Sequence, residues 1–275
     1  MDESMRPALS RSPKGAVTLT FAGDVATVVI DRPQARNAIS RGVISELAAA
    51  VEDVRGSSAR VLVIRGAGDR SFISGGDVKD FAALRTLPDA AEMSRSMRRV
   101  LDSIAALPAV VIAALNGDAF GGGAEVALAA DIRIACDDVV IAFNQVRLGI
   151  MPAWGGIERL TQLIGRGRAT YLLTLGTVLS ADEARECGLV EECVPRVQFA
   201  AAVEILAARI AEAPQPVLAG MKATMQQAYP AIHNDTAESA VDAFAKAWVS
   251  DDHWTAAAAL NARLGSAASH ERPGR

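Results

Sequence analysis

The chain has 275 residues, of which 51% are hydrophobic and 22% are charged, and its formal net charge at pH 7 is −4. This composition suits a globular protein with a full core, whereas an acidic chain with only 4% aromatic residues is a poor candidate for binding nucleic acid. No apolar run approaches the roughly 18 residues of a membrane-spanning helix, so we expect no contact with a membrane.

The polar segment from Met1 to Gly15 is expected to be a flexible tail and not a signal peptide. The chain carries three cysteines at no metal-like spacing: Cys136, Cys187 and Cys193. An odd number of cysteines without an export signal predicts reduced thiols, a cytoplasmic location and no metal site. All three histidines lie in the last fifth of the sequence: His233, His253 and His270. We therefore expect the chemistry to depend on carboxylates and backbone groups and not on histidine.

From the N-terminus, two short β runs meet at Gly23-Asp24, which predicts a hairpin of Val17–Leu19 with Val25–Ile30. Ser40 can cap the helix that follows, whose apolar residues fall on one face. The continuous β-branched run Val61–Ile64 then indicates a buried strand.

A glycine-rich loop, Gly66–Asp77, and a charged helix over about Ala90–Ala106 come next. Pro108 ends that helix, and Val110–Leu115 is expected to be a second buried strand. The pair Asn116-Gly117 then turns the chain toward three consecutive glycines. Both buried strands are therefore followed by glycine-rich loops.

Helical spacing resumes after the glycines, and two further short strands are expected at Ile132–Ala135 and Val139–Phe143. Because strands and helices alternate, we predict an α/β core with parallel strand pairing over residues 16–195. From about Val197 onwards, Ala-rich amphipathic segments replace the strands. Residues 196–275 are therefore expected to form a helical region that packs on the core or on a neighbouring subunit.

The segment from Gly121 to Glu125 is the strongest candidate for a functional site, because a strand, three glycines and a helix follow one another there. Glycines let a ligand approach the main chain closely, and the first N–H groups of a helix have no partner within the helix. Such a place suits a bound anion or an oxygen that becomes negative during a reaction. A phosphate loop is disfavoured because no Gly-Lys-Ser/Thr follows, but glycines that serve only tight helix–sheet packing remain an alternative.

The loop Arg70–Asp77 follows the first buried strand in the same way and contains Ser74-Gly75-Gly76. Loops after the carboxyl ends of parallel strands gather at one edge of the sheet, where ligands bind. Two glycine-rich loops there could each direct one N–H at the same oxygen. The run Gly66-Ala67-Gly68 is only weakly similar to a dinucleotide-binding fingerprint, since it lacks the third glycine and a helix that starts on it.

Five ordered motifs make the chain similar to the enoyl-CoA hydratase/isomerase, or crotonase, superfamily over about Val17 to Val194. They are Asp31-Arg32-Pro33 with Arg36-Asn37-Ala38, then Phe72 to Asp77, Asn116-Gly117 with Gly121 to Glu125 and Asp131, Val146 to Leu160, and Ala184 to Pro195. The resemblance implies a crotonase-like spiral of ββα units with a helical C-terminal oligomerisation region, in trimers or hexamers. It also implies coenzyme A thioesters as substrates, with no separate cofactor bound.

Members of this superfamily stabilise a thioester enolate with two backbone N–H groups, which the resemblance places at Ser74 and Gly122. Preorganised donors of this kind contribute roughly 2.7–4 kcal/mol each in other systems. Gly75, Asp77 and Gly121 belong to the same two motifs, so the resemblance implies that they contact the substrate.

Arg36 and Ala38 fall where the family contacts the nucleotide part of CoA. Arg36 is therefore the candidate cation for the anionic ligand of an acidic protein. A solvated surface arginine with no ligand is the alternative for Arg36.

One position departs from the hydratases that the chain resembles. They carry two glutamates that hold and deprotonate water; Glu125 matches the first, whereas Gln145 stands in place of the second. The segment Val146–Gly149 that follows sets this register without a gap. Gln145 can orient a water or a substrate group, but an amide cannot act as a general acid or base near neutral pH. Loss of one proton-transfer group typically lowers a rate by about 10²–10⁴.

Three reactions remain compatible with this site. Glu125 alone could carry a proton between carbons in an isomerisation, or it could lead a slow hydration. In a decarboxylation of a malonyl-type thioester, a neutral Gln145 would avoid repelling the substrate carboxylate. Trp154 precedes two glycines as in ethylmalonyl-CoA decarboxylases, and it is a candidate for the wall of the acyl pocket, with ordinary core packing as the alternative. A non-catalytic relative that only binds acyl-CoA is the remaining hypothesis, although intact glycine loops and Glu125 favour an enzyme.

Overall fold

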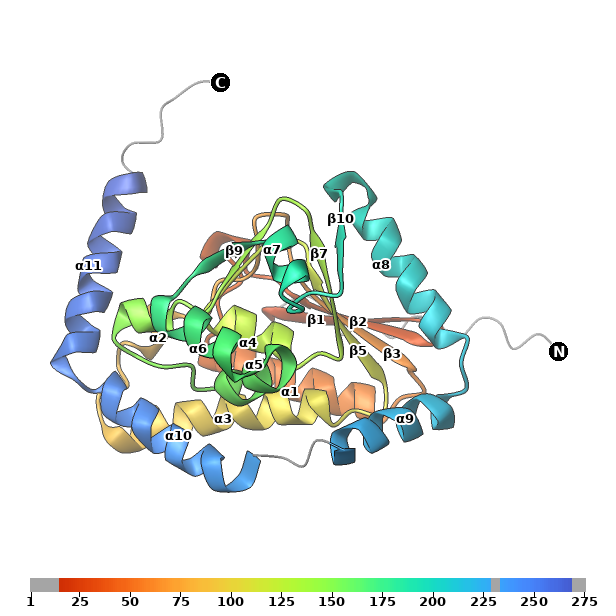
Figure 1. Cartoon of the computed structure of the whole chain (residues 1–275), viewed down its shortest axis with the longest axis horizontal. Coiled ribbons are helices and arrows are strands. Elements are labelled where there is room, and N and C mark those ends of the chain that lie inside the picture. Colours follow the sequence, from red (N-terminus) through yellow and green to blue (C-terminus); the bar gives the residue numbers. More distant parts are fainter. Residues whose placement is uncertain (1–14, 229–232, 269–275) are drawn as a thin grey trace, which may run out of the picture.

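The computed structural model describes residues 15–228 and 233–268. The predicted N-terminal tail lies outside the described residues except for Gly15, and so do residues 269–275. Figure 1 shows β-sheets in the centre of the molecule with helices around them.

The larger sheet has six strands. In spatial order they are β1 (Val17–Ala22), β2 (Val25–Ile30), β3 (Val61–Gly66), β5 (Val110–Leu115), β7 (Ile132–Cys136) and β10 (Glu192–Val194). β1 and β2 pair antiparallel as the predicted hairpin, and every other neighbouring pair in this sheet is parallel. β3 and β5 are apolar and buried over nearly their whole length, as central strands covered on both faces are. The predicted hairpin and both predicted buried strands are confirmed.

The smaller sheet has four short strands. They are β4 (Ser71–Ile73), β6 (Asp118–Phe120), β8 (Val140–Ala142) and β9 (Val178–Ser180). β4, β6 and β8 pair in parallel, whereas β8 and β9 are antiparallel. Four strands were not predicted from the sequence, namely β4, β6, β9 and β10, because strands of three residues are too short to show an alternation of polar and apolar residues.

Successive strands alternate between the two sheets, since β3, β5 and β7 belong to the larger sheet and β4, β6 and β8 to the smaller one. A helix comes after each such pair: α3 (Leu87–Ala105), α4 (Gly122–Leu128) and α5 (Gly156–Ile164). The predicted α/β fold with a spiral of ββα units is thus confirmed. The spiral places the turn after β6, and therefore the start of α4, against the loop after β4.

Shorter elements and one long helix complete the core. They are α1 (Arg41–Arg55), α2 (Val78–Phe81), α6 (Arg166–Leu175), α7 (Ala181–Glu186), η1 (Pro33–Ala35) and η2 (Gln145–Leu148). α1 begins where predicted, because the Ser40 side chain accepts a hydrogen bond from the Val43 N–H at 3.3 Å. Its buried residues pack against β1, β2 and α3.

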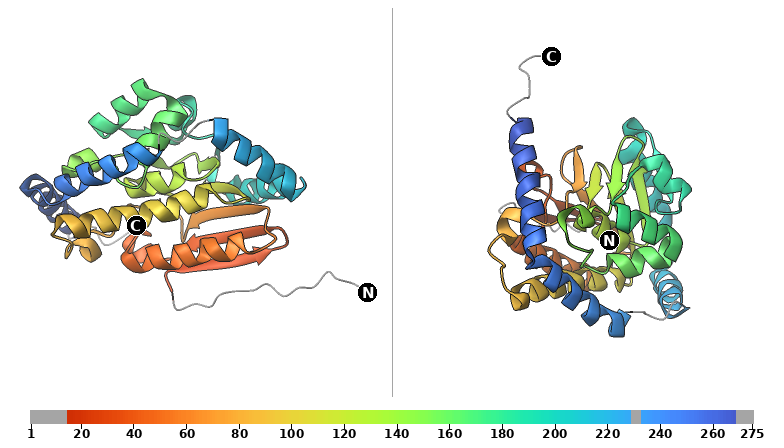
Figure 2. Two further views of the ribbon diagram at one scale, coloured as in Figure 1. Left: turned by 90° about the horizontal axis from the view of Figure 1, so that it is seen from below. Right: turned by 60° about the vertical axis from the view of Figure 1, so that its left-hand side comes forward.

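Four helices follow the last strand: α8 (Arg196–Ala211), α9 (Gln215–Ala228), α10 (His233–Trp248) and α11 (Asp251–Ala268). α8 packs on strands of the larger sheet, whereas α10 lies along α3, where Arg95 and Glu238 form an ion pair at 2.8 Å (Figure 2). α9 is held by the buried Lys222, which donates to the Ala109 carbonyl at 2.9 Å and pairs with Asp131 at 2.6 Å. The C-terminal helices therefore pack on the core of their own chain.

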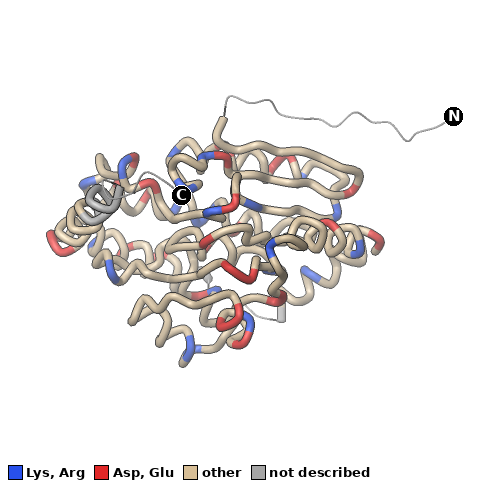
Figure 3. The backbone as a smooth tube through the Cα atoms, turned by 90° about the horizontal axis from the view of Figure 1, so that it is seen from above, with Lys and Arg blue, Asp and Glu red and all other residues tan. Residues whose placement is uncertain are grey.

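Acidic and basic residues are interspersed along the chain in Figure 3. The part of the chain that the structure describes has no helix both long and apolar enough to cross a membrane.

Candidate active site

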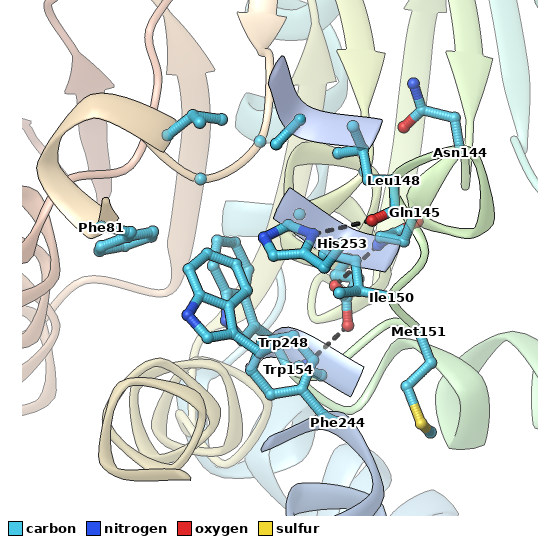
Figure 4. A pocket seen from close by; sticks show the side chains of 18 of the residues that line it. Phe81, Asn144, Gln145, Leu148, Ile150, Met151, Trp154, Phe244, Trp248 and His253 are labelled. Atoms are coloured by element: carbon cyan, nitrogen blue, oxygen red, sulfur yellow. Dashed lines mark hydrogen bonds between the residues drawn. The ribbon is translucent and has the colours of Figure 1, made fainter. Parts of the chain in front are cut away.

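A cavity lies beside the start of α4, where the glycine-rich loops after β4 and β6 meet. Its volume is about 160 Å³, which is enough for several water molecules. Figure 4 shows that its lining also includes η2 and the segment after it, together with side chains of α10 and α11. The lining residues that matter most for chemistry are Gly76, Gly122, Glu125, Gln145, Trp154 and His253.

Glu125 lies in the first turn of α4 and is only 2% exposed. Its Oε1 accepts hydrogen bonds from the N–H groups of Trp154 at 2.7 Å and Gly156 at 3.0 Å, and its Oε2 accepts one from Gln145 Nε2 at 3.0 Å. Burial raises the pKa of Glu125 to about 7, and these hydrogen bonds limit the rise because they favour the charged form. A carboxyl with a pKa near 7 can both take up and return a proton at neutral pH.

Gln145 begins η2 and is 6% exposed. The ionised carboxylate accepts but does not donate, so in this state the amide presents Nε2 and not Oε1 to Glu125. Its Oε1 is buried and has no hydrogen-bond partner among the described residues. Gln145 therefore holds the Glu125 carboxylate and keeps one acceptor unused.

The structure corrects one of the two predicted backbone donors. The Ser74 N–H donates to the Arg36 carbonyl at 3.1 Å, so this donor is already engaged within the protein. The prediction that Ser74 supplies an N–H to the substrate oxygen is wrong. Gly75 follows with φ of +108°, a backbone turn that suits glycine and that re-directs the next peptide groups. The motif shows which residues form the loop, but the direction of each N–H depends on how the loop pairs with its neighbour.

Gly76 has the better-placed donor in this loop. The Ile39 N–H donates to the Gly75 carbonyl, and the Asp77 N–H donates to the Ile39 carbonyl, both at 2.8 Å. Since backbone groups of successive residues in an extended segment point to opposite edges, the Gly76 N–H points away from Ile39. A Cβ built on Gly75 would lie 3.5 Å from the Gly122 nitrogen, so the two loops are in contact. Within the described residues, neither the Gly76 nor the Gly122 N–H has an acceptor, and both glycines line the cavity.

Trp154 forms the wall beside both glycines and is 4% exposed. A Cβ on Gly122 would lie 2.1 Å from Cζ3 of the indole, so only glycine fits there without displacing the ring. A Cβ on Gly76 would lie 3.8 Å from Cη2 of the same ring. The indole thus covers the two candidate donors and restricts water around them, while the backbone N–H of Trp154 binds Glu125.

Arg159 supports the segment that binds Glu125. Its guanidinium is 8% exposed and donates through Nη1 to the Trp154 carbonyl at 2.8 Å, and its Nη2 pairs with Asp102 at 2.5 Å. A second ion pair, Arg98 with Glu158 at 2.6 Å, joins the same two helices, α3 and α5, and both of its side chains are buried. This arrangement fixes the carbonyl of Trp154 and, through it, the N–H groups that hold the carboxylate.

The residues expected to contact CoA have different environments. Arg36 is exposed, whereas Ala38 is buried and its carbonyl accepts a hydrogen bond from Arg32 at 2.6 Å. Gly121 lines the cavity at the N-terminus of α4. Both carboxylate oxygens of Asp77 have partners, because Oδ2 pairs with Arg32 at 2.8 Å and Oδ1 accepts from the first N–H groups of α2. The Asp77 side chain thus shapes the loop, and it is not part of the cavity lining.

Residues of the C-terminal helices and of α2 line the cavity, although the sequence did not predict them there. The lining includes Phe244 and Trp248 from α10, His253 from α11, and Phe81 from α2. The spacing of aromatic residues in helices gives no sign of which face meets a distant loop, so no local signal could identify them. No group of three or more His, Cys, Asp or Glu side chains is placed to hold a metal ion in residues 15–228 and 233–268.

Comparison with known proteins agrees with this geometry. The model of the family described as enoyl-CoA hydratase/isomerase matches residues 20–257. The chain belongs to that family. A crotonyl-CoA hydratase of Syntrophomonas wolfei is 38% identical over 187 residues, which cover 68% of this chain and 72% of the relative. A short-chain-enoyl-CoA hydratase of Clostridium acetobutylicum is 36% identical over 203 residues, 73% of this chain and 77% of the relative.

The fold agrees as well. The crystal structure of an enoyl-CoA hydratase from Mycobacterium avium subsp. paratuberculosis superposes with a TM-score of 0.81 at 29% identity, covering 90% of this chain and 99% of that one. The protein is thus an acyl-CoA enzyme of the hydratase/isomerase family. These similarities give no specific support to the local resemblance to decarboxylases around Trp154.

Proposed function

We propose that Glu125 is the single proton-transfer group of this enzyme and that it acts on a thioester enolate bound by the N–H groups of Gly76 and Gly122. The observation that carries the proposal is the environment of Glu125: a buried carboxyl on the cavity wall with a pKa of about 7. Its side-chain partner is Gln145, an amide that positions the carboxylate and exchanges no proton.

Isomerisation of the double bond is the reaction that this arrangement supports best. The thioester oxygen accepts the two backbone hydrogen bonds, and the Glu125 carboxylate removes a proton from the α-carbon of a 3-enoyl thioester. Negative charge moves onto the thioester oxygen, and the same carboxyl then returns the proton to the γ-carbon. Because no water is added, one proton-transfer group is sufficient.

Hydration is the second candidate, and the unpartnered Oε1 of Gln145 favours it. A water that donates one hydrogen to Gln145 and the other to Glu125 would be held for attack on the β-carbon. Glu125 would then have to take the proton from water and deliver one to the α-carbon, since Gln145 can do neither. Two of the similar proteins are named as hydratases, one a crotonyl-CoA hydratase and the other a short-chain-enoyl-CoA hydratase.

Binding of CoA and assembly extend the proposal. We infer that Arg36, an exposed cation beside the first loop, binds phosphate of the CoA nucleotide, with Ala38 next to it. The large apolar side chains exposed on α8 and α9 support assembly into trimers or hexamers: Val197, Ile205, Val217, Met221 and Met225. The cytoplasmic location stays a prediction, supported by three cysteines that form no disulfide.

The test is to offer the protein a 2-enoyl-CoA, a 3-enoyl-CoA and ethylmalonyl-CoA side by side and to identify the products by mass. We expect interconversion of the enoyl isomers, and we expect Glu125→Ala to lower that rate by at least about 10²-fold with little change in acyl-CoA binding. Glu204→Ala, an exposed glutamate of α8, is the control. Full activity of Glu125→Ala would overturn the proposal.

Gln145→Glu separates the two candidate reactions. If the wild type mainly isomerises, the added carboxyl should raise hydration of 2-enoyl-CoA by about 10-fold or more, because a second proton-transfer group is then present. Hydration by the wild type at the same rate as this variant would show that Gln145 does not limit hydration.

A further inference from the structure

His253 lies near the start of α11 and is 2% exposed, and its ring lines the same cavity as Glu125 and Gln145 (Figure 4). The ring is held firmly. Its Nδ1 lies 2.7 Å from the Leu148 carbonyl, and its centroid lies 4.5 Å from that of Trp248. This histidine therefore has a fixed orientation in the wall of the site.

The contact with Leu148 decides which nitrogen of His253 carries the proton. A carbonyl oxygen only accepts, so Nδ1 has to be the N–H donor. Burial lowers the pKa of His253 below its usual value; the hydrogen bond with Leu148 opposes this effect and the nearby Arg85 adds to it, so the neutral ring is favoured at pH 7. Its Nε2 is then a lone-pair acceptor, and it has no partner within residues 15–228 and 233–268.

The other polar group left unpaired in this wall is also an acceptor. Gln145 directs Nε2 at the ionised Glu125 carboxylate, which leaves its Oε1 without a donor among the described residues. Much of the surrounding lining is apolar or aromatic: Phe81, Met93, Leu148, Phe244 and Trp248. An acyl group that fills this wall therefore has to be apolar overall, and a hydrogen-bond donor on it would pair with an acceptor that is otherwise buried and unsatisfied.

We propose that His253 is a specificity residue and that the enzyme takes acyl-CoA thioesters whose acyl group carries a hydroxyl, which donates a hydrogen bond to His253 Nε2. A hydroxyl fits better than an ammonium, because His253 is neutral and Arg85 lies close by, with its guanidinium 3.4 Å from the Trp254 ring centroid next to His253. This inference rests on the proposed function, since it assumes an acyl-CoA in the cavity.

The experiment compares pairs of 3-enoyl-CoA substrates that differ only in one hydroxyl, placed at successive positions along the acyl chain or on a terminal phenyl ring. For at least one position we expect kcat/KM of the wild type to favour the hydroxylated member by about 10-fold or more. His253→Phe keeps the aromatic stack but removes the acceptor, so the ratio should fall to about one. His253→Gln, which can restore an acceptor near the position of Nε2, should recover part of it.

Asp252→Asn, on the exposed side of the same helical turn, is the matched control and should keep the wild-type ratio. A wild type without preference at any position, or an unchanged ratio in His253→Phe, would overturn the proposal. The same pairs can be titrated by calorimetry into Glu125→Ala protein. If no substrate shows turnover that depends on Glu125, the proposed reaction fails, yet a preference in affinity that depends on His253 still tests this inference separately.

Discussion

Glu125 and Gln145 are a pair of buried side chains with different chemical capacities. The Glu125 carboxyl can exchange a proton near pH 7, whereas the Gln145 amide can only hold that carboxyl in position. Their hydrogen bond also determines the direction of the remaining amide oxygen. An amide in place of a carboxyl at position 145 therefore distinguishes an enzyme with one proton-transfer group from an enzyme with two.

The raised pKa of Glu125 makes a prediction about stability. The folded protein retains the carboxyl proton up to about pH 7, whereas the unfolded chain releases it near 4.5. Stability from this site is therefore present below about pH 4.5 and is lost as the pH rises through about 7. Glutamine cannot ionise. The free energy of unfolding of Glu125→Gln, taken relative to wild type, should therefore be higher at pH 8 than at pH 5 by up to about 3 kcal/mol.

Urea denaturation of both proteins at the two pH values measures this difference in the free energy of unfolding. Glu204→Gln, on the exposed side of α8, should show no such change with pH. Equal effects of Glu125→Gln at pH 5 and pH 8 would mean that the Glu125 pKa is not raised in the folded protein.

At the scale of elements, the segment between η2 and α5 acts as a holder for the catalytic carboxyl. Trp154 and Gly156 each donate a backbone N–H to Glu125, and Arg159 at the next turn of α5 fixes the Trp154 carbonyl. These hydrogen bonds make the geometry of the site depend on the contact between α3 and α5, where Arg159 also forms an ion pair with Asp102.

Arg159→Gln tests this role. Loss of the guanidinium frees the Trp154 carbonyl and removes a positive charge that stabilises the Glu125 carboxylate, so the pKa of Glu125 should rise further. We expect the acid limb of the kcat/KM profile, near pH 7 in wild type, to shift upward by about one unit. Arg166→Gln, an exposed arginine at the start of α6, should leave the profile in place. A fall in activity of Arg159→Gln without any shift would indicate a structural role only.

At the scale of the whole molecule, the C-terminal helices form parts of two different surfaces. α10 and α11 close one side of the cavity, whereas α8 and α9 pack on the core and still expose large apolar side chains. Figure 1 shows α8 and α9 next to one another on the right of the molecule, away from α11. The exposed apolar side chains of α8 and α9 are the surface that we expect to meet other copies of the chain.

Light scattering on the protein as it elutes from a size-exclusion column should give a mass three or six times the 28.7 kDa of one chain. Met221→Glu combined with Met225→Glu places two charges on α9 and should lower that mass, because burial of unpaired charges in an interface is unfavourable. Gln227→Glu, exposed on the same helix, should not. A wild type that elutes as a monomer would contradict the predicted assembly.

The sequence by itself determined much of this protein. Buried β-branched runs identified β3 and β5, the glycine run placed Glu125 at the start of a helix, and the unbroken register of the following motif assigned Gln145. These features are local, since each depends on residues close together in the chain.

Only the tertiary structure decided which groups face the substrate. The Ser74 N–H is engaged by Arg36 and the Gly76 N–H is not, because pairing with Ile39 sets the edge to which each peptide group points. His253 lies in the cavity wall because it contacts Leu148, which is about a hundred residues earlier in the sequence. Neither fact is encoded in local spacing, because both depend on how segments distant in sequence pack against each other.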